Sequence, residues 1–201
     1  MAEVVEAIYF SKKADFYKDI LLHFQELNII EPKHMRIVQK DNWTDESGKE
    51  IGEEDIALAL RDSKIVWTDC KVAKGYAGLN VERKDNIYLL NIWFNCKEYS
   101  CGGGYGRLLK MFMEIAKKYG KDDLILCGFG EELLVEYYPD MADIVKNAHN
   151  VDVWMFSKDS GVYKRLSADA KKGYEKTYAG NYDVLIKKSP EIKDLKLQAW
   201  C

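Results

Sequence analysis

The stretch IYLLNIWF at residues 87–94 decides the fold class, because a long run of branched and aromatic residues predicts a β-strand. The run is apolar at every position except Asn91, which predicts a central strand covered on both faces. Two runs of the same character precede it, IVWT at 65–68 and GYAGLNV at 75–81. The middle of the chain therefore predicts a β-sheet.

Helical and strand-like patterns flank this region on both sides. An apolar strand pattern at residues 4–10 is followed by an amphipathic helix that begins near Ser11 and ends before Pro32. The apolar stripe of this helix consists of Phe16, Ile20, Phe24 and Leu27. After a glycine cluster at 102–106, apolar spacing predicts a second long helix that ends at Gly120.

The C-terminal part of the chain predicts more strands and one more helix. We expect strands at residues 123–127, 151–156 and 182–186. We expect the helix to begin with Pro139 in its first turn. Helices and strands alternate without strict βαβ repeats, and no linker or internal repeat is visible. The sequence therefore predicts a single α+β domain over residues 1–201, with a mixed or antiparallel central sheet flanked by helices.

Composition excludes several functional classes. The 201 residues are 47% hydrophobic and 31% charged, as in ordinary globular proteins, and the net charge of -3 argues against a dedicated nucleic-acid binder. No apolar run reaches the roughly 20 residues that a membrane-spanning helix needs. The opening MAEVVEAIYF carries acids where a signal peptide carries Lys or Arg, so we expect a cytoplasmic protein that does not bind membranes.

Residues that commonly carry catalysis or bind metals are scattered. The cysteines are odd in number and form no CxxC pair, so we expect reduced thiols of the core. The histidines are too far apart for a local HxxxH pair, and no Ser/His/Asp or Cys/His motif is present. We therefore predict neither catalytic residues nor a metal site. The residues concerned are Cys70, Cys96, Cys101, Cys127, Cys201, His23, His34 and His149.

Residues 41–55, DNWTDESGKEIGEED, form an acidic segment with seven acids and one lysine, for a net charge of -6. Such a run is typical of a solvated loop. Its Trp43 also favours a contact surface, because an aromatic ring among charges can anchor an interface. The candidate partner-binding residues are Trp43, Asp45, Glu46, Glu50, Glu53 and Glu54. Residues 158–196 carry ten basic and six acidic side chains, so the surface is expected to be dipolar.

Two groups of aromatic residues have different expected roles. Trp67, Trp93 and Trp154 lie inside strand patterns and are predicted to be core residues. Four tyrosines lie among lysines outside the strong patterns, so some of them should be exposed and suited to protein binding. These tyrosines are Tyr163, Tyr174, Tyr178 and Tyr182.

The glycine cluster before the second long helix admits two interpretations. It resembles the acetyl-CoA loop of the GCN5-related N-acetyltransferases, because Gly104-Tyr105-Gly106 match the end of the pattern Gln/Arg-x-x-Gly-x-Gly/Ala, although Cys101 stands at its first position. That resemblance implies an acyltransferase that holds acetyl-CoA at Gly104, Gly106 and Arg107. The alternative is a structural turn, in which Gly104 and Gly106 adopt backbone angles that L-residues disfavour.

Landmarks across most of the chain resemble the immunity-protein-52 family, which protects bacteria from polymorphic secreted toxins. The matching stretches are FYKDILLHFQELNIIEP at 16–32, YYPDMADIV at 137–145, VWMFS at 153–157 and YAGNYDVLIKKSP at 178–190. The resemblance implies a cytosolic, non-enzymatic protein that binds and blocks a cognate toxin, typically one with a nuclease domain.

Three functional hypotheses follow: a toxin-neutralising binder, an acyltransferase, and a globular protein of neither class. The binder is favoured because it accounts for the lack of a local catalytic motif together with the acidic segment. Such a segment can imitate nucleic acid at the basic cleft of a nuclease and accelerate association. This hypothesis requires a cognate toxin as partner and no cofactor, nucleic acid or membrane.

Overall fold

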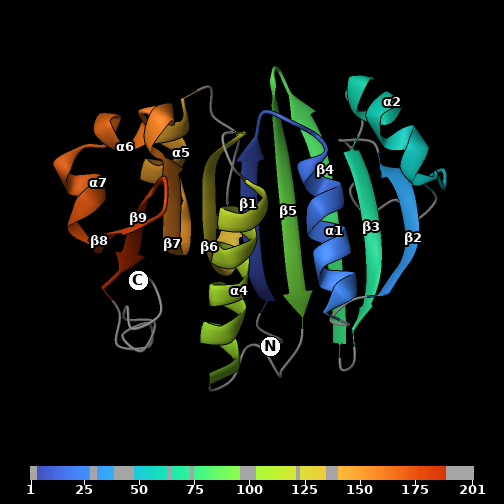
Figure 1. Ribbon diagram of the computed structural model, residues 1–201, viewed down its shortest axis with the longest axis horizontal. Coiled ribbons are helices and arrows are strands. Elements are labelled where there is room, and N and C mark those ends of the chain that lie inside the picture. Colours follow the sequence, from blue (N-terminus) through green and yellow to red (C-terminus); the bar gives the residue numbers. More distant parts are fainter. Residues whose placement is uncertain are drawn as a thin grey trace.

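The computed structural model of the chain describes residues 4–27, 31–38, 48–62, 65–72, 75–95, 103–120, 123–134 and 140–188. Within them, nine strands form one sheet in the order β2-β3-β4-β5-β1-β6-β7-β9-β8 (Figure 1). Every pair of neighbouring strands in it is antiparallel. The strands are β1 (Val4–Ser11), β2 (Glu31–Val38), β3 (Ile65–Val72), β4 (Gly75–Lys84), β5 (Ile87–Asn95), β6 (Leu124–Leu134), β7 (His149–Ser157), β8 (Tyr174–Ala179) and β9 (Tyr182–Lys187).

Helices connect these strands and pack on the sheet. They are α1 (Phe16–Glu26), η1 (Glu53–Asp55), α2 (Ile56–Arg61), α4 (Gly103–Tyr119), α5 (Met141–Asn147), η2 (Lys158–Ser160), α6 (Val162–Arg165) and α7 (Ala168–Lys172). A single antiparallel sheet with helices confirms the predicted α+β class, and the sheet is antiparallel rather than mixed. The helices flank it only in part, as described below.

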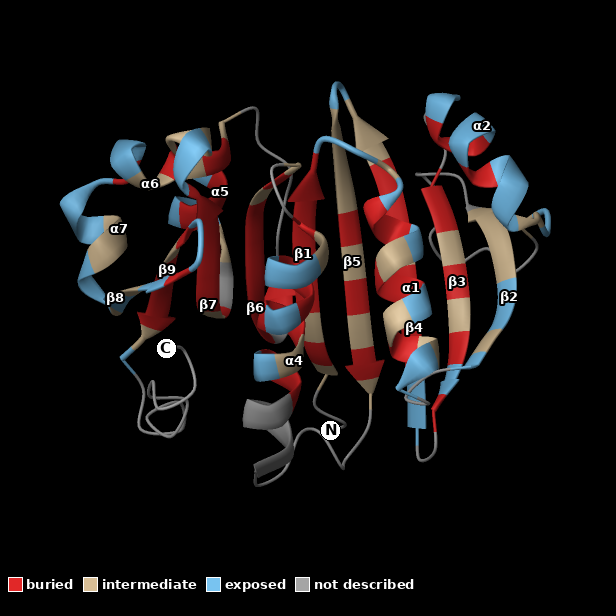
Figure 2. Ribbon diagram, in the orientation of Figure 1, coloured by how far each residue is buried: buried red, intermediate tan, exposed pale blue. Residues whose placement is uncertain are grey.

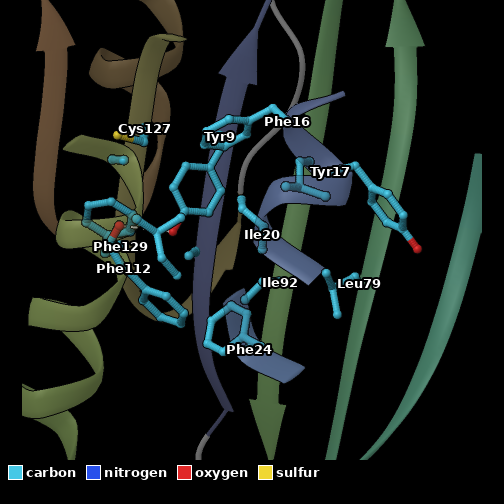
Figure 3. Packing of buried hydrophobic residues seen from close by; sticks show 14 of the residues in the cluster. Tyr9, Phe16, Tyr17, Ile20, Phe24, Leu79, Ile92, Phe112, Cys127 and Phe129 are labelled. Carbon is cyan, nitrogen blue, oxygen red and sulfur yellow. Dashed lines mark hydrogen bonds between the residues drawn. The ribbon is translucent and has the colours of Figure 1, made fainter. Parts of the chain in front are cut away.

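The first face of the sheet is packed against α1 and α4, which Figure 1 shows side by side in front of the central strands. Tyr9 of β1 lies at the centre of this core, with ring centroids 5.3 Å from Phe16 and 5.6 Å from Phe129 (Figure 3). Its hydroxyl donates a hydrogen bond to the carbonyl of Phe112 in α4, at 3.2 Å. The shorter helix α2 packs on the same face over β3 and β4.

Among the described helices, those on the second face cover it toward β6, β7 and β9. There α5 and α6 contribute apolar side chains that pack with those of the strands. Trp154 of β7 is fully buried in this cluster. Its other buried members are Ile8, Phe10, Leu126, Leu133, Met141, Ile144, Val145, Val151, Phe156, Val162, Leu166 and Leu185.

The strand at 87–94 is buried on one face only. Ile92 and Phe94 are buried toward α1 and α4, whereas Asn91 and Trp93 on the second face are part-exposed. Figure 2 shows this alternation of buried and intermediate residues along β5. The prediction of a strand covered on both faces was therefore wrong, because the described helices beside β3 and β4 pack on the first face.

Several predicted boundaries need correction. Helix α4 begins at Gly103, so the glycines that follow lie in a helical turn. Asp140, and not Pro139, begins α5: its carboxylate accepts a hydrogen bond from the Ala142 N–H at 2.7 Å, as an N-cap does. Leu27 is 48% exposed rather than part of the apolar stripe, because it lies just past the end of α1.

The sequence also missed the edge strands β2 and β8 and the short helices α6 and α7. In β8, exposed and part-exposed residues predominate, so the strand lacks the apolar pattern by which the others are found. Within the part of the chain that the structure describes, no helix is long and apolar enough to cross a membrane.

Candidate functional site

The sheet register places Trp67 of β3 and Trp93 of β5 together on the second face, where no described helix covers them. One cross-strand row consists of Arg36, Trp67, Asn80, Asn91 and Ile8. The next row consists of His34, Asp69, Gly78, Trp93 and Glu6. We call the following part of these rows the tryptophan face: Arg36, Trp67, Asp69, Gly78, Asn80, Asn91 and Trp93.

The two indole rings form the centre of the tryptophan face. Their centroids are 6.0 Å apart and the ring planes are inclined by 49°. The Trp93 ring lies across Gly78, because a Cβ at residue 78 would lie 2.7 Å from two atoms of that ring and 2.8 Å from a third. Glycine at this position therefore lets the ring lie flat on the neighbouring strand. Both tryptophans remain part-exposed, so the prediction that they are core residues holds only for Trp154.

Polar contacts hold Trp67 in place. Its indole N–H donates a hydrogen bond to Asp69 Oδ1 at 2.7 Å. The other carboxylate oxygen of Asp69 lies 3.4 Å from Nη2 of Arg36, on the adjacent strand β2. A side chain whose polar end is bonded in this way loses little further rotamer freedom when a partner binds.

Two amides lie beside the rings. Asn80 and Asn91 are directly opposite each other on β4 and β5, and Asn80 is also opposite Trp67. The Oδ1 atoms of both asparagines are buried and accept no hydrogen bond. A buried acceptor without a donor costs about 1–3 kcal/mol. The two amides therefore have unused hydrogen-bonding capacity.

The edge of the sheet at β2 brings one predicted partner-binding residue to this face. Glu50 forms an isolated bridge with Arg36, and its Oε1 lies 3.0 Å from Nδ1 of His34. His34 is opposite Asp69 in the second cross-strand row. Glu50 of the acidic segment is therefore next to the tryptophan face.

The other predicted partner-binding residues are placed less closely. Glu53 and Glu54 lie in η1, where both are exposed. That turn leads into α2, which packs on the first face of the sheet. Trp43, Asp45 and Glu46 lie outside the described residues, so their role remains a prediction.

The predicted acetyl-CoA residues lie at the start of α4. Gly104 and Gly106 are in its first turns, and a right-handed helix has negative φ angles. The expectation that they adopt angles disfavoured by L-residues was therefore wrong. Arg107 is in the same helix, and Cys101 lies outside the described residues.

The titratable groups with shifted pKa values discussed next lie outside the tryptophan face and outside the start of α4. Burial raises the pKa of the Cys70 thiol to about 12, with a smaller contribution from Asp69, and burial also raises the pKa of Cys127. Both are buried free thiols, as expected. Burial and the nearby Lys118 lower the pKa of His23, whose Nδ1 lies 3.0 Å from the Tyr119 hydroxyl between α1 and α4. Among the described residues, no group of His, Cys, Asp and Glu could hold a metal ion.

The tyrosines that lie among lysines form a second, smaller surface at the opposite end of the sheet. Lys176 Nζ lies 3.8 Å from the ring centroid of Tyr163 and 4.9 Å from that of Tyr178. Tyr178 is 56% exposed and Tyr182 is buried, so the prediction that some of these tyrosines are exposed is confirmed.

The tryptophan face was not predicted, although the sequence contains two signals of it. Asn91 is the only polar residue in the run at 87–94, and Gly78 interrupts the preceding strand pattern. A glycine inside a strand often marks close approach by another group. The signal became interpretable only with the register, which places Gly78 opposite Trp93.

Comparison with known proteins adds little to this description. No family model matches the sequence, and no curated protein matches it. Among solved structures, the chain is similar to the crystal structure of the AdoMetDC-delta26 monomer of Trypanosoma brucei, with 9% identity and a TM-score of 0.29. The match covers 93% of this chain and 66% of the trypanosomal chain. At this TM-score the similarity carries no argument about fold or function.

Proposed function

We propose that this chain is an immunity protein, which binds a cognate toxin through the tryptophan face and thereby occludes the active site of the toxin. The observation that carries the proposal is the pair Trp67 and Trp93, part-exposed on a sheet face that no described helix covers. Tryptophan is among the residues most enriched where single side chains dominate protein–protein affinity.

The geometry of the pair favours protein recognition. Gly78 supports the Trp93 ring from below, and Asp69 holds the Trp67 indole from the side. Rigid aromatic rings bury a large area on binding at a small cost in conformational entropy. A standard interface buries about 800 Å² on each partner, so a docked protein would extend from the rings over the neighbouring strands.

The acidic segment supports the finer proposal that the toxin has a basic active-site cleft, as a nuclease does. Glu50 joins this segment to the edge of the tryptophan face through its bond to His34. Negative charge beside a docking surface steers a positively charged partner toward it and raises the association rate.

The proposal predicts that a toxin is encoded beside the gene for this chain, and the direct test is affinity for that toxin. We expect Trp93→Ala to weaken binding by at least about 30-fold, equivalent to about 2 kcal/mol, and Trp67→Ala to have a similar effect. Tyr178→Ala is the matched control, because it removes an exposed aromatic ring at the far end of the same sheet, and its affinity should change less than about threefold. Isothermal titration calorimetry gives the affinities, and circular dichroism verifies that each variant is folded.

Two outcomes would contradict the proposal. One is a folded Trp93→Ala variant that binds the toxin as well as the parent does. The other is that the parent neither binds the toxin nor protects a host that expresses it. If acetyl-CoA then raised the melting temperature of the parent, the acyltransferase alternative at Gly104, Gly106 and Arg107 would replace the immunity proposal.

A further inference from the structure

We infer that the group which the tryptophan face receives from its partner is an arginine side chain. This inference rests on the proposed function and names the chemistry of the contact. Three features of the face carry it: a supported aromatic platform, two amide oxygens that accept no hydrogen bond, and an acidic border.

The aromatic platform is suited to a flat cation. One π-face of Trp93 is turned toward Gly78, so the other is turned away from the sheet. Trp67 is inclined to it by 49° at a centroid distance of 6.0 Å, so the two rings form an open angle rather than a closed stack. Tryptophan is the best aromatic partner for a cation, and the planar guanidinium group of arginine stacks on such a ring.

The two amides supply acceptors for the same group. Neither Asn80 Oδ1 nor Asn91 Oδ1 accepts a hydrogen bond, so rotating either amide by half a turn breaks no bond to its oxygen. Both side chains are part-exposed, and the rotation exchanges the positions of Oδ1 and Nδ2. A rotation that brings Oδ1 to the surface would offer this unused acceptor to a bound donor. A guanidinium group has five N–H donors and no acceptor, which matches a surface that offers oxygens.

The charges around the face favour a partner that brings a cation. Arg36 of the face already has a carboxylate neighbour in Asp69, and nearby on β4 Lys84 Nζ is 3.2 Å from Glu82 Oε1. At the β2 edge, the exposed carboxylate of Glu50 lies next to His34 and bridges to Arg36. Lysine has a compact charge and no planar group, so it uses the platform less well than arginine does.

The test uses NMR spectra of the intact ¹⁵N-labelled protein, in which each tryptophan gives one indole N–H signal. The probes are a capped Gly-Arg-Arg-Gly peptide, the same peptide with citrulline in place of both arginines, and the lysine peptide. Citrulline retains the shape of arginine but lacks its charge. We expect the arginine peptide to shift the Trp67 and Trp93 signals and to leave the Trp154 signal in place.

Variants locate the contact on the face. The citrulline peptide should bind at least about tenfold more weakly than the arginine peptide, and the lysine peptide should lie between them. Trp93→Ala should abolish the shift of the Trp67 indole signal. The double variant Asn80→Ala/Asn91→Ala should bind the arginine peptide severalfold more weakly, and Tyr178→Ala should bind it as the parent does. Equal binding of the arginine and citrulline peptides, or shifts confined to other tryptophans, would overturn the inference.

The result is separable from that of the proposed function. If Trp93→Ala loses toxin affinity while the arginine peptide leaves the Trp93 signal unmoved, the arginine inference is wrong and the immunity proposal stands. If the arginine peptide binds at Trp93 while the toxin does not bind at all, the immunity proposal is wrong and the arginine contact stands.

Discussion

The same glycine–tryptophan pair occurs twice on the second face of the sheet, with opposite outcomes. Trp154 of β7 lies over Gly128 of β6, and Trp93 of β5 lies over Gly78 of β4. In both pairs, a Cβ on the glycine would lie 2.7 Å from the indole ring. Trp154 is fully buried, whereas Trp93 is part-exposed.

The difference lies in what covers each pair. Over Trp154, the chain supplies Met141, Ile144 and Val145 from α5, together with Val162 from α6. Over Trp93 no described helix supplies such residues, and its cross-strand partners are Gly78 and Glu6. The comparison shows that one packing device is enclosed in the core where described helices cover it and stays part-exposed where they do not.

Removing the two rings should have the largest and most unequal effect. Trp154→Ala should lower the free energy of unfolding by about 3–5 kcal/mol, because it leaves a cavity in a packed core. Trp93→Ala should cost about 1–2 kcal/mol, since less area is returned to water. Urea unfolding of both variants measures the difference. Equal losses would show that Trp93 is a core residue like Trp154, and the comparison would fail.

Adding a methyl group beneath each ring should separate the two pairs more finely. Gly128→Ala should destabilise the fold by about 1–3 kcal/mol, because the enclosed Trp154 ring cannot move away. In Gly78→Ala the part-exposed Trp93 ring can tilt outward, so stability should fall by less than about 1 kcal/mol. Toxin affinity should fall in Gly78→Ala and stay unchanged in Gly128→Ala. If toxin affinity instead stayed unchanged in Gly78→Ala and fell in Gly128→Ala, the Trp93 ring would not belong to the proposed interface.

A smaller effect than that of removing the Trp154 ring is expected from loosening the cover over it. Asp140 caps α5 and its Oδ2 lies 3.0 Å from Arg165 Nη1, which ties α5 to α6. Asp140→Ala should cost about 1 kcal/mol and increase acrylamide quenching of Trp154. Ser167→Ala is the control, because it removes the cap of α7, a helix without buried residues, and should leave that quenching unchanged. Increased quenching in both variants would show that the cover does not depend on α5.

The strands and long helices could be predicted from the sequence because their signals are local. Alternating or continuous apolar runs identified β1, β3, β4 and β5, and the stripe of Phe16, Ile20 and Phe24 identified α1. Edge strand β8 was missed, because an edge strand has few apolar residues to reveal it. The start of α5 was misplaced at Pro139 because the Asp140 cap was overlooked, although Asp is a favoured N-cap residue.

The candidate site could be predicted only in fragments. The acidic segment was predicted to bind a partner, and the structure places its Glu50 at the β2 edge. Trp67 and Trp93 were assigned to the core with Trp154 because all three lie in similar apolar runs. Nothing local distinguishes a strand that will be covered from one that will stay open. That distinction depends on which helices arrive at each face of the sheet.

By itself, the sequence determined the class of the fold, the order of most elements and the residues available at each position, because these follow from local spacing and composition. The tertiary structure alone decided the strand order, with β1 at the centre, and the register that sets Gly78 beneath Trp93. It also decided that α5 and α6 cover only the half of the second face around Trp154. The physical reason is that burial depends on contacts between segments far apart in the chain, which no local pattern encodes.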